Sequence, residues 1–275
     1  MWSTGRAALL SVVAVVACAT PAQGSPAVGV GAEDQRQLIP AYVFPTGGAT
    51  AANPWHQLCS RMTSGSIIVM NPGSGPGGQV QEPYTEAMGY CRARPRKQLV
   101  LGYVYTSYTA RPLADVIADI DTWYRLYPRL DGIFVDEMAS FPHGTGTAEG
   151  LSAKDYYARI YSHTRRKSAH HGELVVVNPG VTATTPWQLD VSDKVVVFEG
   201  DRAAYAKWTP EPWVTRRPAD QIVQLVHSTP SSRRHHVCQL SRARNAGYVD
   251  VTDDVMINPW DTVPGYWREV APVCR

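Results

Sequence analysis

The chain has 275 residues, of which 44% are hydrophobic and 18% are charged. This is enough apolar material for a packed core in one large domain or two small ones, so the composition excludes a disordered chain. The 26 basic and 24 acidic side chains leave a formal net charge of +2, which gives no support for a nucleic acid or a membrane surface as a partner.

The chain begins with the pattern of a secretory signal peptide over residues 1–24. Arg6 carries the only side-chain charge of this segment, and the apolar run Ala7–Ala19 is too short to cross a bilayer. We therefore expect export, followed by an N-terminal segment over 25–37 and one folded domain over 38–275. A buried N-terminal helix is the alternative interpretation of the apolar run.

The five cysteines allow two further predictions. The residues Val15 to Cys18 are similar to a bacterial lipoprotein processing site, so Cys18 is a possible lipid anchor. The other four are an even number in an exported chain, which indicates two disulfides with three possible connectivities. No CxxC pattern or close Cys/His spacing indicates a zinc site, and we expect no metal.

Short apolar or β-branched runs alternate with longer polar or amphipathic stretches from residue 38 onward. Near-continuous apolar runs are typical of strands covered on both faces. The predicted strands are Ile39–Phe44, Ser66–Met70, Leu99–Tyr105, Gly132–Val135, Leu174–Val177, Lys194–Phe198, Ile222–Val226 and Gly247–Val251.

The stretches between these runs predict helices, three of which have proline near their start, where a missing N–H costs little. The predicted helical segments are Pro54–Arg61, Pro83–Arg94, Pro112–Leu126, Ala153–Ser168, a turn at Trp187–Leu189, Arg202–Trp208, Arg233–Asn245 and Tyr266–Val270.

Eight strand–helix units in one chain are typical of a single (β/α)8 TIM barrel. A doubly wound open α/β sheet has the same alternation of strands and helices and remains the alternative. In a barrel, Cys59 and Cys91 would lie on the first and second helices, which are neighbours, and Cys238 would lie on the seventh helix with Cys274 just beyond the eighth. We therefore predict the disulfides Cys59–Cys91 and Cys238–Cys274.

Acidic side chains follow two of the predicted strands. Asp136 and Glu137 come directly after Gly132–Val135, and Glu199 follows Lys194–Phe198. Chemistry in a TIM barrel occurs at the carboxyl ends of the strands, and carboxylates next to an apolar core are costly without partners. Two acids that face one barrel mouth have the arrangement that glycoside hydrolysis needs. A solvated strand end or a helix cap is the structural alternative for any one of them.

Other polar and aromatic side chains stand at or near the same strand ends. We expect them to be candidate sugar contacts, although aromatic residues on an inner strand can equally belong to the barrel core. The candidates are Tyr42, Asn71, Tyr103, Tyr105, Asn178, His227 and Asp250. The glycine-rich loop 73–78 lacks the lysine of a phosphate-binding loop and is predicted to be a rim loop.

Six stretches, taken in this order, resemble the spherulin-4-like family. They are Ile39–Pro45 (IPAYVFP), Ile67–Gly77 (IIVMNPGSGPG), Val100–Thr106 (VLGYVYT), Asp131–Glu137 (DGIFVDE), Val177–Gly180 (VNPG) and Val197–Gly200 (VFEG).

The resemblance implies a (β/α)8 glycoside hydrolase whose three essential acids correspond to Asp136, Glu137 and Glu199. Characterised fungal members cleave α-1,4-linked N-acetylgalactosamine stretches of an extracellular biofilm polysaccharide. By analogy with related galactosaminidases, Asp136 would be the nucleophile or stabiliser and Glu199 the general acid, while Glu137 would hold substrate or tune its neighbour. The expected partner is a polysaccharide, and we expect a monomer that needs no cofactor and no partner protein.

Two other classes of function remain open. One is a carbohydrate-binding or cell-surface coat protein that keeps the barrel without turnover. The other is a deacetylase or esterase, although no GxSxG elbow or metal pattern supports it.

Overall fold

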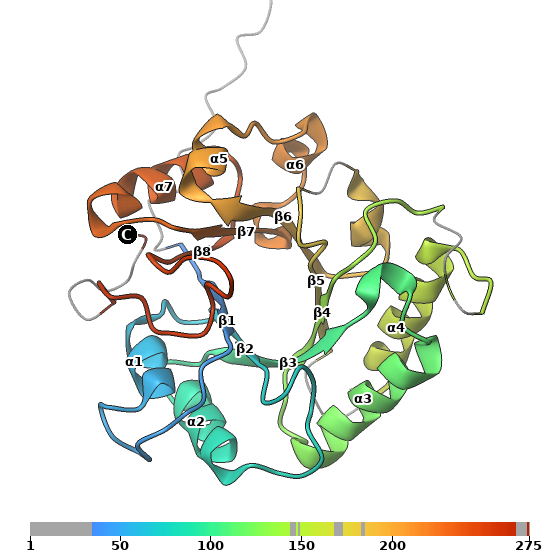
Figure 1. Ribbon diagram of the computed structural model, residues 1–275, viewed down its shortest axis with the longest axis horizontal. Helices are drawn as coiled ribbons and strands as arrows, with labels where there is room; N and C mark the ends of the chain where they lie inside the picture. Colours follow the sequence, from blue (N-terminus) through green and yellow to red (C-terminus); the bar gives the residue numbers. More distant parts are fainter. Residues whose placement is uncertain are drawn as a thin grey trace, which may run out of the picture. The chain divides into compact units, whose positions relative to one another are not determined.

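Eight parallel strands follow one another in chain order around a barrel, each hydrogen-bonded to the next (Figure 1). They are β1 (Leu38–Ala41), β2 (Ile67–Met70), β3 (Leu99–Tyr105), β4 (Gly132–Asp136), β5 (Leu174–Val177), β6 (Lys194–Asp201), β7 (Ile222–His227) and β8 (Tyr248–Val251). The Val249 N–H donates to the Arg36 carbonyl at 3.0 Å, which nearly closes the barrel between β8 and the residues before β1. The TIM-barrel prediction is confirmed, and the open doubly wound sheet is wrong.

This computed structural model describes residues 35–143, 147, 149–167, 173–182, 185–267 and 274. The predicted signal peptide, Cys18 and most of the segment 25–37 lie outside these residues. Within the described part of the chain, no helix has the length and apolar character needed to cross a membrane.

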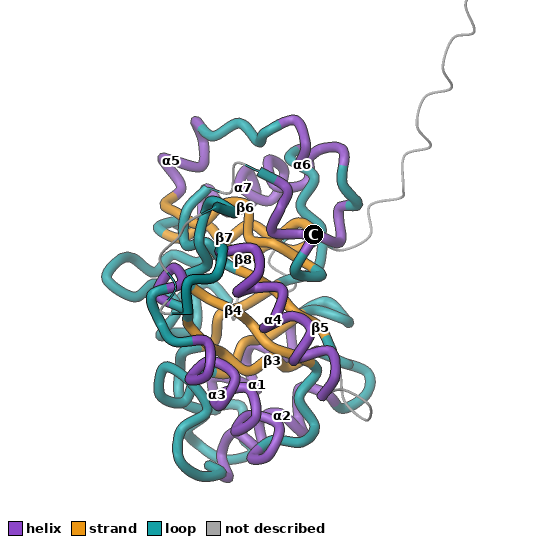
Figure 2. The backbone as a smooth tube through the Cα atoms, turned by 90° about the vertical axis from the view of Figure 1, so that its right-hand side faces the viewer, coloured by secondary structure: helices purple, strands orange, loops and turns teal. Residues whose placement is uncertain are grey.

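Helices surround the strands, as the tube in Figure 2 shows. The α-helices are α1 (Pro54–Arg61), α2 (Glu82–Arg92), α3 (Leu113–Leu126), α4 (Ala153–Lys167), α5 (Arg202–Lys207), α6 (Pro212–Arg216) and α7 (Ser231–Ala243), and the 3-10 helices are η1 (Ser107–Thr109), η2 (Pro186–Asp190) and η3 (Ala219–Gln221). The sequence did not predict α6, η1 or η3. Tyr266 and Trp267 lie in a turn, and the rest of the helix predicted at Tyr266–Val270 lies outside the described residues.

Helix starts follow local chemistry. Asn53 caps α1, because its side-chain oxygen accepts the Trp55 N–H at 2.9 Å, and Pro54 occupies the first turn, where no N–H is needed. Asp201 caps α5 in the same way by accepting the Ala204 N–H at 2.7 Å.

Side chains along each strand alternate between two apolar cores. One core fills the barrel and includes Leu38, Val69, Phe134, Val176 and Leu225. The other core lies between the strands and the helices. Because the period of a strand is two residues, polar side chains two positions beyond an inward-facing residue also face the inside of the barrel, at its carboxyl end.

The two disulfides join neighbouring elements. Cys59 on α1 is bonded to Cys91 on α2 with a Cα–Cα distance of 5.2 Å, and Cys238 on α7 is bonded to Cys274 with a Cα–Cα distance of 5.3 Å. Both predicted pairings are confirmed.

Candidate active site

Asp136 is the last residue of β4 and lies two positions after Phe134, so its side chain faces the inside of the barrel mouth. Its Oδ2 accepts a hydrogen bond from the Tyr103 hydroxyl at 2.9 Å, and its Oδ1 accepts one from the Asn178 amide nitrogen at 2.9 Å. Burial and the nearby charge of Glu199 raise the pKa of Asp136 from 3.8 to about 6, although the Tyr103 bond acts in the opposite direction.

Glu199 reaches the same mouth through an irregularity in β6. The register of β6 against β7 shifts between Val196 and Phe198, so Val197 is an extra residue in the strand. Val196 faces the barrel core, and without this bulge Glu199, three positions later, would face the helices. The bulge instead turns Phe198 toward the helices and Glu199 toward the inside.

Asn178 joins these two acids. Its amide nitrogen donates to Asp136 Oδ1 at 2.9 Å and to Glu199 Oε2 at 2.7 Å, and its own Oδ1 accepts the Gly180 N–H at 3.0 Å. The last bond fixes which end of the amide points toward the acids. One oxygen of each acid therefore has a donor, Asn178, that is held by the backbone of the loop after β5.

Trp260 completes the surroundings of Glu199. The indole N–H donates to Glu199 Oε1 at 3.1 Å, and the Trp260 carbonyl accepts the Tyr42 N–H at 3.0 Å. Sequence reasoning did not single out Trp260, because this residue lies nine positions after the end of β8. The only sequence signal was that a tryptophan occurs in a loop at the carboxyl end of a strand.

Glu137 has a left-handed backbone (φ 52°), and its carbonyl is held by the loop after β3. The Tyr108 N–H and the Thr106 hydroxyl both donate to it, at 2.8 Å each. The side chain of Glu137 is partly buried, and its charge, together with the charges of Asp136 and Glu199, raises the pKa of Tyr108 after the larger effect of burial. The three acids therefore act on one exposed tyrosine at the mouth.

Tyr42 and His227 border the acid cluster. The Tyr42 ring meets Tyr103 edge to face at a centroid distance of 5.5 Å, and burial followed by the charge of Asp136 raises the pKa of Tyr42. His227 meets Trp260 edge to face at 6.3 Å, and burial lowers the pKa of its imidazole. Together with Tyr103 and Asn178, these candidates gather near the acids.

The remaining three candidates have other contacts. The Asn71 side-chain oxygen accepts the Gly75 N–H at 3.0 Å and so shapes the glycine-rich loop. Tyr105 lies under the guanidinium of Arg111, at 4.4 Å from its ring centroid. Asp250 is buried, and its Oδ1 accepts the Val251 N–H at 2.8 Å.

The acid cluster has no basic partner in the part of the chain that the structure describes. The ion pairs found there involve other carboxylates, and none includes Asp136, Glu137 or Glu199. Within residues 35–267, apart from the undescribed gaps, no group of three His, Cys, Asp or Glu side chains is arranged to hold a metal ion. Asp136 and Glu199 are therefore held by neutral donors.

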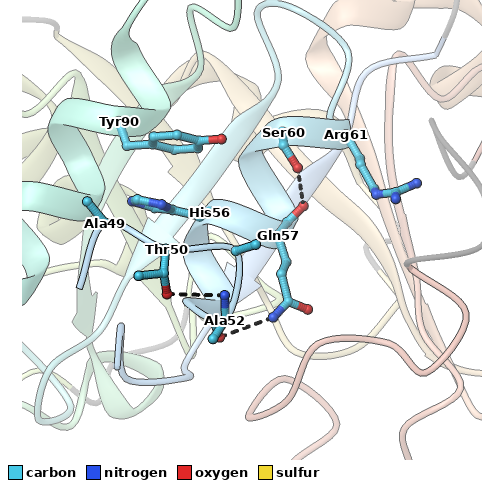
Figure 3. A pocket seen from close by; sticks show the side chains of 9 residues that line it. Ala49, Thr50, Ala52, His56, Gln57, Ser60, Arg61 and Tyr90 are labelled. Atoms are coloured by element: carbon cyan, nitrogen blue, oxygen red, sulfur yellow. Dashed lines mark hydrogen bonds between the residues drawn. The ribbon is translucent and has the colours of Figure 1, made fainter. Parts of the chain in front are cut away.

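A separate hollow of about 710 Å³ lies outside the barrel, between the loop 49–52, α1 and Tyr90 of α2 (Figure 3). The Tyr90 ring stacks on His56 at a centroid distance of 3.7 Å. The polar groups of Gln57 and Ser60 are bonded to nearby backbone carbonyls. This hollow has no carboxylate in its lining, so we place the candidate site at the barrel mouth.

Solved structures share the barrel. The crystal structure of Aspergillus clavatus Sph3 in complex with GalNAc superposes with a TM-score of 0.67 at 23% identity, covering 88% of this chain and 97% of that one. A GH18 chitinase from Pseudoalteromonas aurantia superposes with a TM-score of 0.51 at 12% identity, covering 78% and 93%. These similarities show that the chain shares the barrel fold of both structures.

Two sequence comparisons lead to the family. Spherulin-4 of Physarum polycephalum is 34% identical over 190 residues, which are 68% of this chain but only 51% of that protein, so the chain matches about half the length of this relative. The family model for spherulation-specific family 4 matches residues 36–273, a range that includes the whole barrel and its acid cluster. The chain therefore belongs to spherulation-specific family 4.

Proposed function

We propose that this protein is a secreted, endo-acting glycoside hydrolase that cleaves α-1,4-linked polysaccharide of galactosamine or N-acetylgalactosamine. The observation that carries the proposal is the amide nitrogen of Asn178, which donates to both Asp136 and Glu199 at the barrel mouth. The family membership and the fold shared with Sph3, which was crystallised with GalNAc, support it.

The spacing of the two acids favours retention of the anomeric configuration. Two of their oxygens bond to one nitrogen, so their separation is at most the sum of 2.9 Å and 2.7 Å. Retaining glycosidases separate their carboxyl groups by about 5–5.5 Å, whereas inverting enzymes need about 6.5–9.5 Å to admit a water molecule. The short distance between these two oxygens therefore favours the retaining arrangement for the pair Asp136 and Glu199.

Asp136 is the nucleophile or stabiliser in this proposal. Tyr103 and Asn178 hold one oxygen each, so the carboxylate is positioned before the sugar arrives. It forms a bond to the anomeric carbon as the glycosidic bond breaks. If the sugar is N-acetylated, the oxygen of its own acetamide attacks instead, and Asp136 orients that group.

Glu199 is the general acid and gives its proton to the departing glycosidic oxygen. The Trp260 indole and the Asn178 amide nitrogen only donate hydrogen bonds, so both favour the carboxylate that remains after proton transfer. In the second step Glu199 takes a proton from a water molecule, whose oxygen attacks the anomeric carbon, and the bond to Asp136 breaks, so that both carboxyl groups return to their starting state. Glu137 lies beside Asp136 and is assigned to holding substrate.

Export is part of the proposal. The predicted signal peptide over 1–24 and the two disulfides are consistent with an oxidising compartment. Anchoring through Cys18, and the monomeric state, stay predictions. Expression in a host that processes signal peptides, followed by mass spectrometry of the mature N-terminus, would distinguish cleavage near Gly24 from lipidation of Cys18.

The activity is tested by incubating the mature protein with acetylated and partly deacetylated α-1,4-galactosaminan. We expect oligosaccharides by mass spectrometry from the wild type but not from Asp136→Asn or Glu199→Gln, and the first product seen by NMR should keep the α configuration. Binding without any product would favour the non-catalytic carbohydrate-binding alternative. Equal product from all three proteins would place the active site elsewhere.

A further inference from the structure

In the described part of the chain, the large exposed apolar side chains lie at one end of the barrel. Among the described residues, every exposed large hydrophobic side chain lies on a loop that follows the carboxyl end of a strand. We call this set the apolar rim; its members are Phe44, Val80, Tyr108, Phe141, Val181, Val255, Met256 and Ile257. These side chains share the end of the barrel that carries the acids, and exposed apolar side chains are a common feature of binding surfaces.

Tyr108 is the rim residue next to the acids. Ser107, Tyr108 and Thr109 all have left-handed backbones, with φ of 46°, 56° and 81°, a conformation that costs about 1 kcal/mol or more for each residue that is not glycine. Hydrogen bonds from the loop hold this turn, and the Tyr108 side chain is nonetheless 53% exposed. The chain thus keeps a strained turn that presents an aromatic ring at the mouth.

The loop after β8 forms the other end of the rim. Its tip, Val255 to Ile257, is 58%, 65% and 95% exposed, and a few residues later the same loop brings Trp260 to Glu199. In Figure 1 this loop, coloured red, lies beside β1 and β8. An apolar tip and a contact to a candidate catalytic acid therefore belong to one segment.

The charge of the rim loops limits what they can bind. Residues 42–53, 71–81, 137–152, 178–189 and 252–265 contain no Lys or Arg, and the last of these loops carries Asp253, Asp254 and Asp261. The loop that carries Tyr108 contains one basic residue, Arg111, which forms an ion pair with Asp119. Such loops offer nothing to an anionic lipid surface or to a polyuronate. They suit a neutral or cationic ligand that has apolar faces.

We propose that the apolar rim binds an extended aminosugar chain on both sides of the sugar held by the acids. The inference rests on the proposed function and adds its substrate-binding surface. Pyranose rings and acetyl methyl groups offer apolar faces that stack on aromatic and aliphatic side chains, and an aminosugar is neutral when acetylated and cationic when not. Tyr108 contacts the sugars nearest the acids, and Ile257 contacts sugars farther along the chain.

Binding is tested without turnover, in the Glu199→Gln background, by co-sedimentation with insoluble α-1,4-linked N-acetylgalactosamine polymer. Tyr108→Asn removes the ring with a residue that tolerates the left-handed backbone, and Ile257→Ser removes the exposed tip. The matched control is Arg129→Ser, an exposed residue in the loop before β4 at the opposite end of the barrel. Each rim variant should bind about threefold to tenfold more weakly, and the control should not.

The outcomes separate this inference from the proposed hydrolysis. An unchanged melting temperature will show that the rim variants fold. If such variants bind the polymer as tightly as the control does, the inference is overturned, even if the wild type cleaves the polymer. Polymer binding that depends on the rim in a wild type that releases no oligosaccharides would support the rim and reject the hydrolase. Ile257-dependent binding to phosphatidylcholine vesicles, without polymer binding, would instead assign the rim to a lipid surface and overturn the inference.

Discussion

The two ends of the barrel differ in the partners that they provide to a partly buried carboxylate. At the amino end, Asp131 precedes β4, forms an ion pair with Arg92 and accepts the Val100 N–H at 2.8 Å. At the carboxyl end of the same strand, Asp136 accepts hydrogen bonds from the neutral side chains of Tyr103 and Asn178 and lies close to another acid, Glu199. Burial raises the pKa of both groups, but Arg92 opposes the effect at Asp131 whereas Glu199 adds to it at Asp136.

This difference indicates a structural role for the carboxylate at the amino end and a chemical role for the one at the carboxyl end. A carboxylate with a cation and a backbone donor stabilises the start of a strand. When a carboxyl group lies beside another acid, the neighbouring negative charge disfavours its ionised form. Groups with a pKa raised in this way are concentrated at sites where they react. The following experiments exchange or remove these features.

The largest expected effect comes from Asp136→Asn compared with Asp131→Asn. Asp136→Asn should lower kcat/KM on galactosaminan at least about 10³-fold, because the amide cannot serve as nucleophile. Asp131→Asn should lower the melting temperature by weakening the Arg92 pair but leave the kcat of folded protein near the wild-type value. If Asp131→Asn loses as much activity as Asp136→Asn, the division between the two ends is wrong.

The pH profile of kcat/KM sharpens the assignment of Asp136. The pKa of this group is raised from 3.8 to about 6, so a nucleophile there loses its charge as the pH falls through 6. We expect kcat/KM to decrease about tenfold per pH unit below that value. The measurement is initial rates between pH 4 and pH 8, with stability checked at each pH. An acidic limb centred near pH 4 would contradict the raised pKa, and activity that instead falls as the pH rises through 6 would make Asp136 the acid.

Asp250 tests the free-energy cost of a buried carboxylate for which the described residues provide no ion pair. Burial raises its pKa from 3.8 to about 7, so the folded state binds the proton more tightly than the unfolded state. The cost therefore appears as the pH rises above about 4 and is complete above 7. Asp250→Asn should raise the free energy of unfolding by roughly 2–4 kcal/mol at pH 8 and have little effect near pH 4. Denaturant titrations at the two pH values measure this, and a stabilisation that is equal at both would exclude the titration as its cause.

The smallest effect is expected from Trp260→Phe. The change keeps an aromatic ring against His227 but removes the N–H that donates to Glu199. We expect kcat to decrease about tenfold, because one hydrogen bond to a charged group is lost. Trp208→Phe is a suitable control, since its indole lies on the helix side of the barrel near Phe198. An equal decrease of kcat in both variants would show that Trp260 has no specific role in the active site.

Much of the fold was predictable, because the strands are short apolar runs covered on both sides. The predicted start of β3 and of β5 agrees with the structure, and α1 was predicted over the same residues that it occupies. The two disulfide pairings followed from the barrel order, because consecutive helices are neighbours in such a fold. The short α6 was missed, since five residues show too little periodicity.

The candidate site was only partly predictable. Asp136, Asn178 and Tyr103 have the inward phase of their strands, so alternation alone brings them to the mouth. Glu199 is out of phase with Val196, and only the bulge in β6 turns it inward. Trp260 reaches Glu199 through a long loop whose path no local pattern encodes.

The sequence by itself determined the order of strands and helices, the cysteine pairs and which acids stand at strand ends, because these depend on local periodicity and on neighbours along the chain. Only the tertiary structure decided that one amide of Asn178 joins Asp136 to Glu199, that a bulge turns Glu199 inward and that Trp260 returns to it. These features depend on register shifts and on contacts between segments up to 61 residues apart, which packing of the whole barrel selects.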